Sequence, residues 1–200
     1  MDDLDNLHDH SISVIDRTIY IGQKDKDDDP IGYMNSTTFI KNLDYLNSLN
    51  RTPITVKLIN VTGGDVGHGL AMFGAIAASK SKVNIHCYGY TASFGTILLQ
   101  SAATNGRLIS QYAEFMIHYG STQLDSDLIS AESAASATKL WRNNMLNIYA
   151  TRCINGEFFK ERKYSISKVK GYINTKLRNT ADWYMSPDEA LYYGFVDAIT

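Results

Sequence analysis

The sequence predicts an α/β fold, in which strands and helices alternate along the chain. Two apolar runs of strand length, 54–60 and 83–88, are each followed by an irregular, glycine-containing turn and then by a helical segment. Near the carboxyl end, Ser186-Pro187-Asp188-Glu189 forms a capping box with proline at the first helical position, and a last apolar run follows it. Strands separated by helices in this way need crossover connections, which are typical of the α/β class.

Hydrophobic periodicity and turn residues give the expected elements in order. Ser36 is the predicted N-cap of the first helix. We expect strands over 12–21, 54–60, 83–88, 115–118 (within the segment 112–119) and 195–199. We expect helices over 36–50, 66–79, 93–103, 128–154 and 187–193, and one or two short helices within 158–178. The aspartates of the polar loop 22–30 are spaced as in the start of a calcium loop, but Pro30 stands where that loop needs glycine. We therefore expect no metal site, and no cofactor motif is complete.

Composition places the chain among ordinary globular proteins. With 200 residues, 44% of them hydrophobic and 20% charged, the chain is long enough for one domain with a sizeable core. A net charge of −2 argues against nucleic acid as a partner, and no apolar run is long enough to cross a bilayer. The acidic first ten residues lack the apolar segment of a secretory signal, and the two cysteines have no metal or redox spacing. These features predict a cytoplasmic protein with reduced thiols.

Two glycine-containing turns carry the candidate chemistry, and each has a structural alternative. Gly63-Gly64 follows the strand 54–60, and its backbone N–H groups would suit an oxyanion, although a turn of this kind is more often structural. The spacing of the glycines that follow is the reverse of a dinucleotide-binding motif. Ser93 opens the second turn, where a serine is most often a helix N-cap but would also be placed as a nucleophile.

A nucleophilic serine needs a base, and the five histidines differ in their suitability. His118 ends the apolar run Phe115-Met116-Ile117, where a neutral imidazole gains a dry environment and a fixed orientation. The others lie in an amino-terminal tail or within predicted helices and strands: His8, His10, His68 and His86. Asp182 is the carboxylate to consider, because Trp183-Tyr184-Met185 would partly bury it, although a surface aspartate before a capped helix is the alternative. Each of these residues alone favours a structural role.

Three segments together resemble the Clp protease proteolytic-subunit (ClpP) family of serine peptidases. They are ITVKLINVTGGDVGHGLAMFGAI, CYGYTASFGTILLQSA with FMIHYGS, and DWYMSPDEALYYGFVDAI, in the order of that family. The intervals from Gly64 to Ser93 (93 − 64 = 29) and from Ser93 to His118 (118 − 93 = 25) fit the family without insertion or deletion. The resemblance covers roughly residues 17–199, and its combined motifs are far more specific than any one of them.

The resemblance implies roles for five residues. Ser93 would be the nucleophile, His118 the general base, and Asp182 the residue that orients the imidazole. The backbone N–H groups of Gly64 and Phe94 would form the oxyanion hole. The implied reaction is hydrolysis of peptide bonds by acyl transfer, without cofactor or metal.

The resemblance also implies a fold and an assembly. The fold would be ClpP/crotonase-like, with repeated β-β-α units in one domain, 1–200, and a protruding handle helix over 127–156. Homo-oligomeric rings, stacked in pairs in the family, would enclose a chamber for peptides or unfolded proteins, and an AAA+ unfoldase would supply them.

The chain departs from the family in several places. The interval from His118 to Asp182 (182 − 118 = 64) is longer than usual, so we place an inserted helical segment at 157–180. The stretch GSTQLDSD after His118 lacks the family's glycine-rich sequence, so ring stacking is less firmly predicted than ring formation. The segment 1–16 is too short for the family's axial loop and first helix. This shortness predicts an altered unfoldase partner or none. A compact variant of this kind suggests a bacteriophage origin.

Three functions therefore follow from the sequence. The leading one is an active serine endopeptidase. The alternatives are a catalytically silent ring subunit with the same fold, and an acyl-CoA enzyme of the crotonase type, which shares the fold and oxyanion hole but needs no serine–histidine pair. The presence of Ser93, His118 and Asp182 together favours the first.

Overall fold

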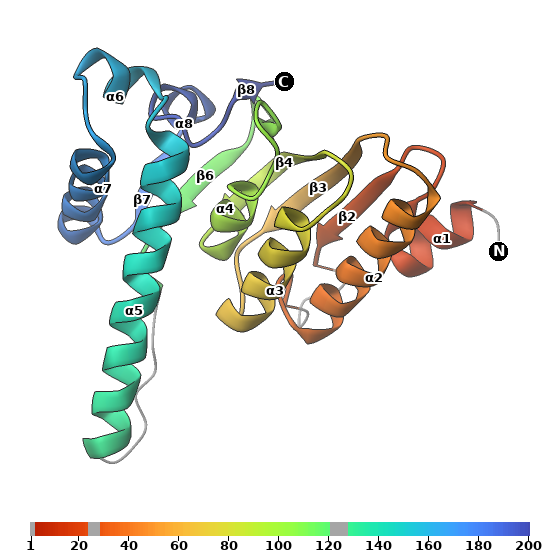
Figure 1. Ribbon diagram of the computed structural model, residues 1–200, viewed down its shortest axis with the longest axis horizontal. Helices are drawn as coiled ribbons and strands as arrows, with labels where there is room; N and C mark the ends of the chain where they lie inside the picture. Colours follow the sequence, from red (N-terminus) through yellow and green to blue (C-terminus); the bar gives the residue numbers. More distant parts are fainter. Residues whose placement is uncertain (1–2, 24–28, 121–127) are drawn as a thin grey trace.

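A mostly parallel sheet forms the centre of the computed structural model, which describes residues 3–23, 29–120 and 128–200 (Figure 1). Within these ranges eight strands are found: β1 (Ile12–Ser13), β2 (Thr18–Gly22), β3 (Ile54–Val61), β4 (Val83–Ala92), β5 (Arg107–Ile109), β6 (Glu114–Ile117), β7 (Trp183–Met185) and β8 (Ala198–Ile199). The main path is β1-β2-β3-β4-β5-β8, and β6 pairs with β4 and β7. Only the β1–β2 and β6–β7 pairs among these strands are antiparallel. The predicted α/β class is confirmed.

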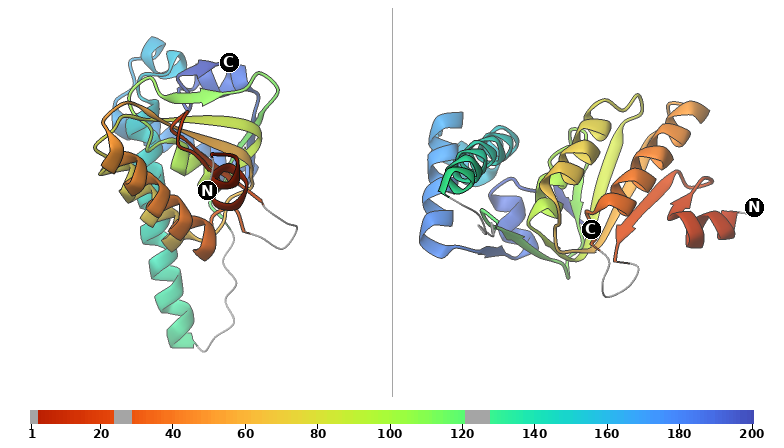
Figure 2. Two further views of the ribbon diagram at one scale, coloured as in Figure 1. Left: turned by 90° about the vertical axis from the view of Figure 1, so that its right-hand side faces the viewer. Right: turned by 90° about the horizontal axis from the view of Figure 1, so that it is seen from below.

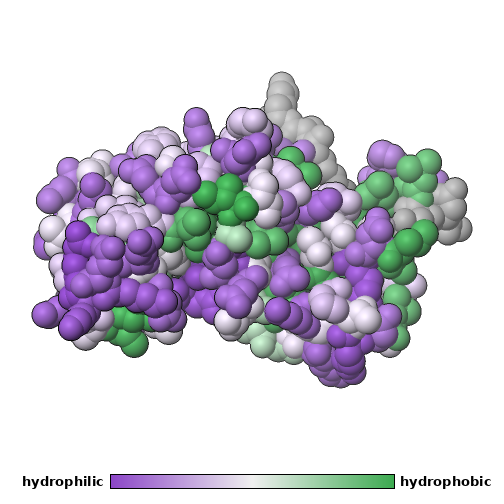
Figure 3. Space-filling model, turned by 90° about the horizontal axis from the view of Figure 1, so that it is seen from above, coloured by the Kyte–Doolittle hydropathy of each residue, from purple (hydrophilic) through white to green (hydrophobic). Residues whose placement is uncertain are grey.

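The helices lie between these strands along the chain: α1 (Asp3–His10), α2 (Tyr33–Leu49), α3 (Val66–Ala77), α4 (Phe94–Leu99), α5 (Leu128–Cys153), α6 (Glu157–Glu161), α7 (Ile166–Thr180) and α8 (Pro187–Tyr192). Figures 1 and 2 show α2, α3 and α4 on one face of the sheet, while the amino-terminal half of α5 extends beyond it. Figure 3 shows one face of the molecule, which is mostly hydrophilic on its left side and has hydrophobic residues near its middle. Among the described residues no helix is long and apolar enough to cross a membrane.

Two predictions about the amino-terminal part are wrong. The expected strand over 12–21 is two strands, because Arg17 has a positive φ of 50° and turns the chain between them. His8 and His10 of the amino-terminal tail lie in α1, a helix that the sequence did not predict. Ser36 is not an N-cap: α2 already begins at Tyr33, and the buried Ser36 hydroxyl donates to the Tyr33 carbonyl at 3.0 Å. The aspartates at 25 and 27 lie outside the described residues.

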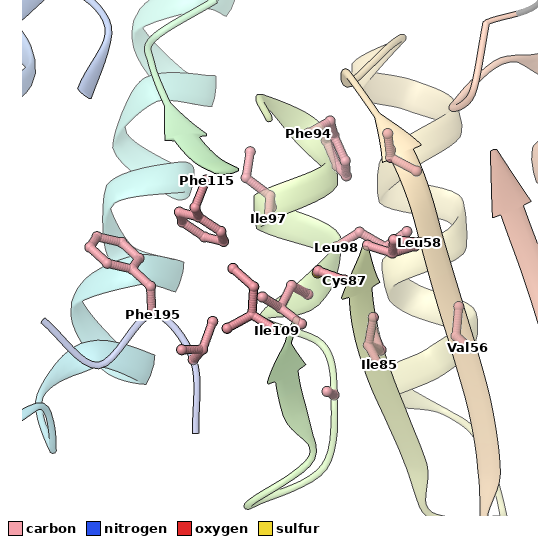
Figure 4. Packing of buried hydrophobic residues seen from close by; sticks show 14 of the residues in the cluster. Val56, Leu58, Ile85, Cys87, Phe94, Ile97, Leu98, Ile109, Phe115 and Phe195 are labelled. Atoms are coloured by element: carbon pink, nitrogen blue, oxygen red, sulfur yellow. The ribbon is translucent and has the colours of Figure 1, made fainter. Parts of the chain in front are cut away.

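The core lies where α3 and α4 pack on the sheet. Alternate residues of β3 and β4 are buried, as the period of two in a strand requires. Figure 4 shows Ile97 and Leu98 of α4 between Phe115 on one side and Leu58 on the other. All four side chains are at most 3% exposed, and burial of each contributes roughly 1.5–3 kcal/mol. This packing fixes α4, whose amino-terminal end carries Ser93.

On the edge of β4 that faces β5 and β6, the pairing partner changes halfway along the strand. Its first half, Ile85–Cys87, pairs with β5, and its second half, Tyr90–Ala92, pairs with β6. Gly89 lies between the two halves with a φ of 65°, and the Tyr90 N–H donates to Asn60 Oδ1 at 3.0 Å instead of to a strand. The sheet therefore divides at this point, and β6 leaves from the carboxyl end of β4.

The carboxyl-terminal segment is fastened to the sheet by a buried ion pair. Arg107 of β5 contacts the Asp197 carboxylate, and it also donates to Gln100 Oε1 and to the Gly194 carbonyl, each at 2.8 Å. The Arg107 N–H donates to the second carboxylate oxygen of Asp197 at 3.0 Å. Burial alone would raise the pKa of Asp197, but these hydrogen bonds and the charge of Arg107 outweigh it and hold the pKa below its ordinary value.

Because the folded-state pKa of Asp197 is depressed, its contribution to stability is present above the ordinary carboxyl pKa and is lost as pH falls through the folded-state value. We expect Asp197→Asn to lower the free energy of unfolding at pH 7 by about 1–2 kcal/mol. The difference from the wild type should shrink below about pH 4. Urea unfolding followed by circular dichroism at pH 7, 5 and 3 measures it, with the exposed Asp44→Asn as control. A difference that stays constant over this range would contradict the assignment.

Candidate active site

Strand register alone brings three distant segments of the chain together. Ala92 pairs in parallel with Met116, so Ser93 follows β4 beside the carboxyl end of β6, and its N–H donates to the Met116 carbonyl at 3.1 Å. Ile117 pairs antiparallel with Trp183, so the next pair outward is His118 and Asp182. The two ladders meet at β6, and Ser93, His118 and Asp182 therefore lie at one edge of the sheet.

The three side chains are in contact. Ser93 Oγ lies 2.8 Å from His118 Nε2, and His118 Nδ1 lies 3.3 Å from Asp182 Oδ1. Both contacts are satisfied when the imidazole is neutral with its proton on Nδ1, which then donates to the carboxylate while Nε2 accepts from the serine. The His118 side chain is 25% exposed and that of Asp182 is 48% exposed. Asp182 is thus less buried than the sequence predicts, and its neighbour Tyr184 is itself exposed.

Ser93 has an unusual backbone conformation. It occupies the N-cap position of α4 with a φ of 51° and a ψ of −126°, and its side chain makes no capping hydrogen bond. A non-glycine residue in such a region costs of order 1–3 kcal/mol, which the surrounding packing must offset. The alternative that Ser93 serves only as a helix cap does not describe this geometry, because the hydroxyl is directed to His118 instead.

The Gly63-Gly64 turn lies directly against this serine. Gly63 and Gly64 have φ values of 120° and 142°, which strongly favour glycine. A Cβ atom on Gly63 would lie 2.6 Å from Ser93 Cβ, and one on Gly64 would lie 2.5 Å from the Ile31 carbonyl oxygen. Within the described part of the chain, the amides of Gly64 and Phe94 donate to no protein acceptor. Two unpaired N–H groups thus belong to turns that pack on each other beside Ser93.

Residues that the sequence analysis did not identify support this turn. Thr96 Oγ1 donates to the Ser93 carbonyl at 2.6 Å and lies 2.7 Å from the Tyr149 hydroxyl of α5. The Phe94 ring stacks on Trp141 of α5 with centroids 5.5 Å apart. Gly69 of α3 is in close contact with the same Phe94 ring, where a Cβ atom would collide with it. No local motif marks Thr96, Tyr149 or Trp141, since their roles depend on how α5 packs against α4.

The other histidines lie elsewhere. His68 Nδ1 is 3.2 Å from the Ser36 hydroxyl, and the His68 N–H donates to Asp65, the N-cap of α3. His86 Nδ1 is 2.9 Å from the Tyr88 hydroxyl, and its Nε2 is 2.5 Å from Thr200 Oγ1. Of the histidines the sequence analysis weighed, His118 is the one brought to Ser93. In the ranges that the structure describes, no three His, Cys, Asp or Glu side chains form a group that could hold a metal ion.

A cleft of about 1500 Å³ adjoins His118 and Asp182. It lies between α5 and α7, which run side by side in Figures 1 and 2. Tyr119 and Gly120 continue its wall from β6, and Ala181 continues it from α7. The helix α7 lies within the segment that the sequence analysis predicts as an insertion, so residues of that segment form one side of this cleft.

Comparison with known proteins gives the family. The family described as Clp protease matches residues 14–200. The chain is 26% identical to the ATP-dependent Clp protease proteolytic subunit of Deinococcus radiodurans over 184 residues, which cover 92% of this chain and 80% of that protein. It is 28% identical to subunit 2 of Prochlorococcus marinus subsp. pastoris over 191 residues (92% and 82%), and 31% identical to the subunit of Streptococcus thermophilus over 176 residues (85% and 80%). The mixed α/β fold with its mostly parallel sheet is consistent with the ClpP/crotonase fold. The chain belongs to the Clp protease family.

Proposed function

We propose that this chain is a serine endopeptidase with Ser93 as nucleophile, His118 as general base and Asp182 as the residue that orients the imidazole. The observation that carries the proposal is the contact series from Ser93 Oγ to His118 Nε2 (2.8 Å) and from His118 Nδ1 to Asp182 (3.3 Å). The positive φ of Ser93 supports it, because backbone strain of this kind clusters at functional sites.

The reaction is acyl transfer in two steps. Ser93 Oγ attacks the carbonyl carbon of a peptide bond while His118 Nε2 takes the hydroxyl proton, and Asp182 stabilises the resulting imidazolium. The backbone N–H groups of Gly64 and Phe94 bind the oxygen of the tetrahedral intermediate. His118 then gives its proton to the leaving amine, which breaks the C–N bond and leaves an acyl ester on Ser93. A water molecule, deprotonated by His118, hydrolyses the ester and restores the serine.

The assembly is also part of the proposal. The relatives are named proteolytic subunits of ATP-dependent Clp proteases, and we infer that this chain forms a homo-oligomeric ring that receives peptides or unfolded protein, with an AAA+ unfoldase as partner. Residues 127–156 would then be the handle helix by which two rings meet. The particle mass, measured by light scattering, distinguishes a monomer, a single ring and a stacked pair. The cytoplasmic location stays a prediction.

Labelling with a fluorophosphonate tests the proposed nucleophile. The reagent should attach to Ser93 Oγ, as located by mass spectrometry of the digested protein, because His118 activates this hydroxyl. Labelling should be absent in Ser93→Ala and strongly suppressed in His118→Ala. A folded, assembled protein that takes up no label would support the catalytically silent ring subunit, or an acyl-CoA enzyme of the crotonase type, in place of the peptidase.

The glycine turn supplies a second test. Gly63→Ala should lower kcat/KM for a fluorogenic peptide by roughly 10²–10³, the loss expected when an oxyanion donor is displaced. The new methyl group would lie 2.6 Å from Ser93 Cβ and 3.3 Å from the Phe94 nitrogen, at a φ of 120°. Gly74→Ala is the matched control, because a Cβ atom there meets nothing within 4 Å. Equal kcat/KM values for the two variants, both folded by circular dichroism, would remove the Gly63-Gly64 turn from the site.

A further inference from the structure

The cleft between α5 and α7 differs in charge from the rest of this slightly acidic chain. Four of its lining residues are cations, two on each helix: Lys139 and Arg142 on α5, and Lys170 and Arg178 on α7. Asp182 is the carboxylate that lines it, and Asp182 already contacts His118. Among the described residues none of the four cations forms an ion pair with a carboxylate. Counted over the described residues, four cations against the carboxylate of Asp182 leave the lining of the cleft with a net positive charge beside the proposed catalytic residues.

Hydrogen bonds hold the walls of the cleft in place. Lys170 Nζ donates to Asn143 Oδ1 at 2.6 Å and links α7 to α5. The Tyr119 hydroxyl donates to the Asn174 carbonyl at 3.2 Å, and the Arg142 guanidinium lies 4.9 Å from the Tyr119 ring. Tyr119 follows His118 directly in the chain, so this network connects the cations to the end of β6. Lys170 and Arg142 are thus in contact with the walls of the cleft, while the exposed Lys139 and Arg178 complete its positive lining.

The dimensions of the cleft suit an extended peptide. Pockets for small ligands have volumes of about 300–1000 Å³, and this cleft of about 1500 Å³ is larger. Its polar lining, with Asn143, Asn174 and Ser167, offers hydrogen-bond partners along its length. His118 both contacts Ser93 and lines the cleft, so the space between the two helices adjoins the position of the scissile bond.

We propose that the cleft between α5 and α7 binds acidic side chains of the peptide substrate, and that Arg142 and Arg178 are its main specificity-determining residues. The inference rests on the proposed peptidase function. The arginines favour carboxylates over neutral side chains because a guanidinium presents a planar set of donors that matches a carboxylate. The chemistry that recognises the substrate is therefore supplied in large part by α7, the segment that lengthens the interval between His118 and Asp182.

Two fluorogenic peptides of equal length test the proposal. They share the residues at the scissile bond and differ only in flanking positions, which are glutamate in one peptide and glutamine in the other. We expect the wild type to have a kcat/KM about three- to tenfold higher for the glutamate peptide, as one or two half-exposed ion pairs would give. The ratio of the two values should fall toward one in Arg142→Gln/Arg178→Gln. It should also fall for the wild type at high salt, a measurement that needs no variant.

Lys168→Gln is the matched control, because Lys168 is an exposed cation of α7 that does not line the cleft, and the ratio should be unchanged in this variant. If Ser93 takes up the fluorophosphonate and both peptides are cleaved equally in the wild type, the cleft proposal is overturned while the peptidase proposal stands. If Ser93 is not labelled and neither peptide is cleaved, the peptidase proposal itself fails. A double variant with an altered particle mass and an unaltered ratio would make the cleft an interface between copies and overturn the substrate role.

Discussion

Replacing Ser93 by alanine should lower kcat for peptide hydrolysis by roughly 10⁴–10⁶, because residues that act as a unit lose most of their effect when one is removed. The substitution removes the attacking oxygen and leaves the neighbouring packing in place, since Phe94 and Thr96 keep their contacts with Trp141 and Tyr149. The remaining activity would come from the oxyanion donors and substrate binding alone. We expect the fold and the particle mass to be unchanged.

The measurement is a progress curve with a fluorogenic peptide at enzyme concentrations high enough to detect the residual rate. Ser101→Ala is the matched control, because Ser101 lies a few residues further along the same segment and, among the described residues, its hydroxyl donates to the Leu98 carbonyl at 2.7 Å and not to His118. Hydrolysis by Ser93→Ala at more than about one hundredth of the wild-type rate would show that another group is the nucleophile.

Replacing Asp182 by asparagine should lower kcat by roughly 10²–10⁴. An amide at this position can donate to His118 Nδ1, which would hold the imidazole in the tautomer with its proton on Nε2 and deprive Ser93 of an acceptor. We expect a value toward the lower end of this range, because Asp182 is 48% exposed and its oxygen is 3.3 Å from Nδ1, so water can partly replace it.

Asp188→Asn is the control for this substitution. Asp188 is an exposed residue in the first turn of α8, close in sequence to Asp182 but not in contact with His118. Steady-state kinetics of both variants with the same peptide separate the two aspartates. If both lose activity to the same extent, Asp182 is not the third member of the site.

Local sequence patterns predicted much of the fold and little of the chemistry. The strand over 54–60, the glycine turn after it and the capping box at Ser186 depend on neighbouring residues, and the structure has each of them. Ser93 and His118 belong to short motifs that favour structural roles, and only their spacing within the family pointed to a shared site. Their contact depends on the pairing of β4 with β6, which begins at Tyr90, directly after the positive-φ Gly89. A change of strand partner is decided by tertiary packing, so no local pattern reveals it.

The inserted segment shows a second limit. The interval between His118 and Asp182 predicted extra helices, and α6 and α7 lie there. The sequence did not indicate that α7 packs beside α5 and lines a cleft with Arg178, because such a contact depends on the path of the chain after Cys153. The N-cap of α3 was also not predicted: Asp65, directly after the two glycines, accepts the His68 backbone N–H at 2.9 Å.

During synthesis, a ribosome releases His118 well before Asp182, because 182 − 118 = 64 residues separate them. At about 5–20 residues per second this interval lasts roughly 3–13 s. Throughout that time β6 has no β7 to pair with, so Ser93 and His118 are without the carboxylate that the antiparallel register of β6 and β7 supplies. Under the proposed mechanism, a nascent chain therefore lacks the residue that orients His118 until position 182 has emerged and β7 has paired with β6.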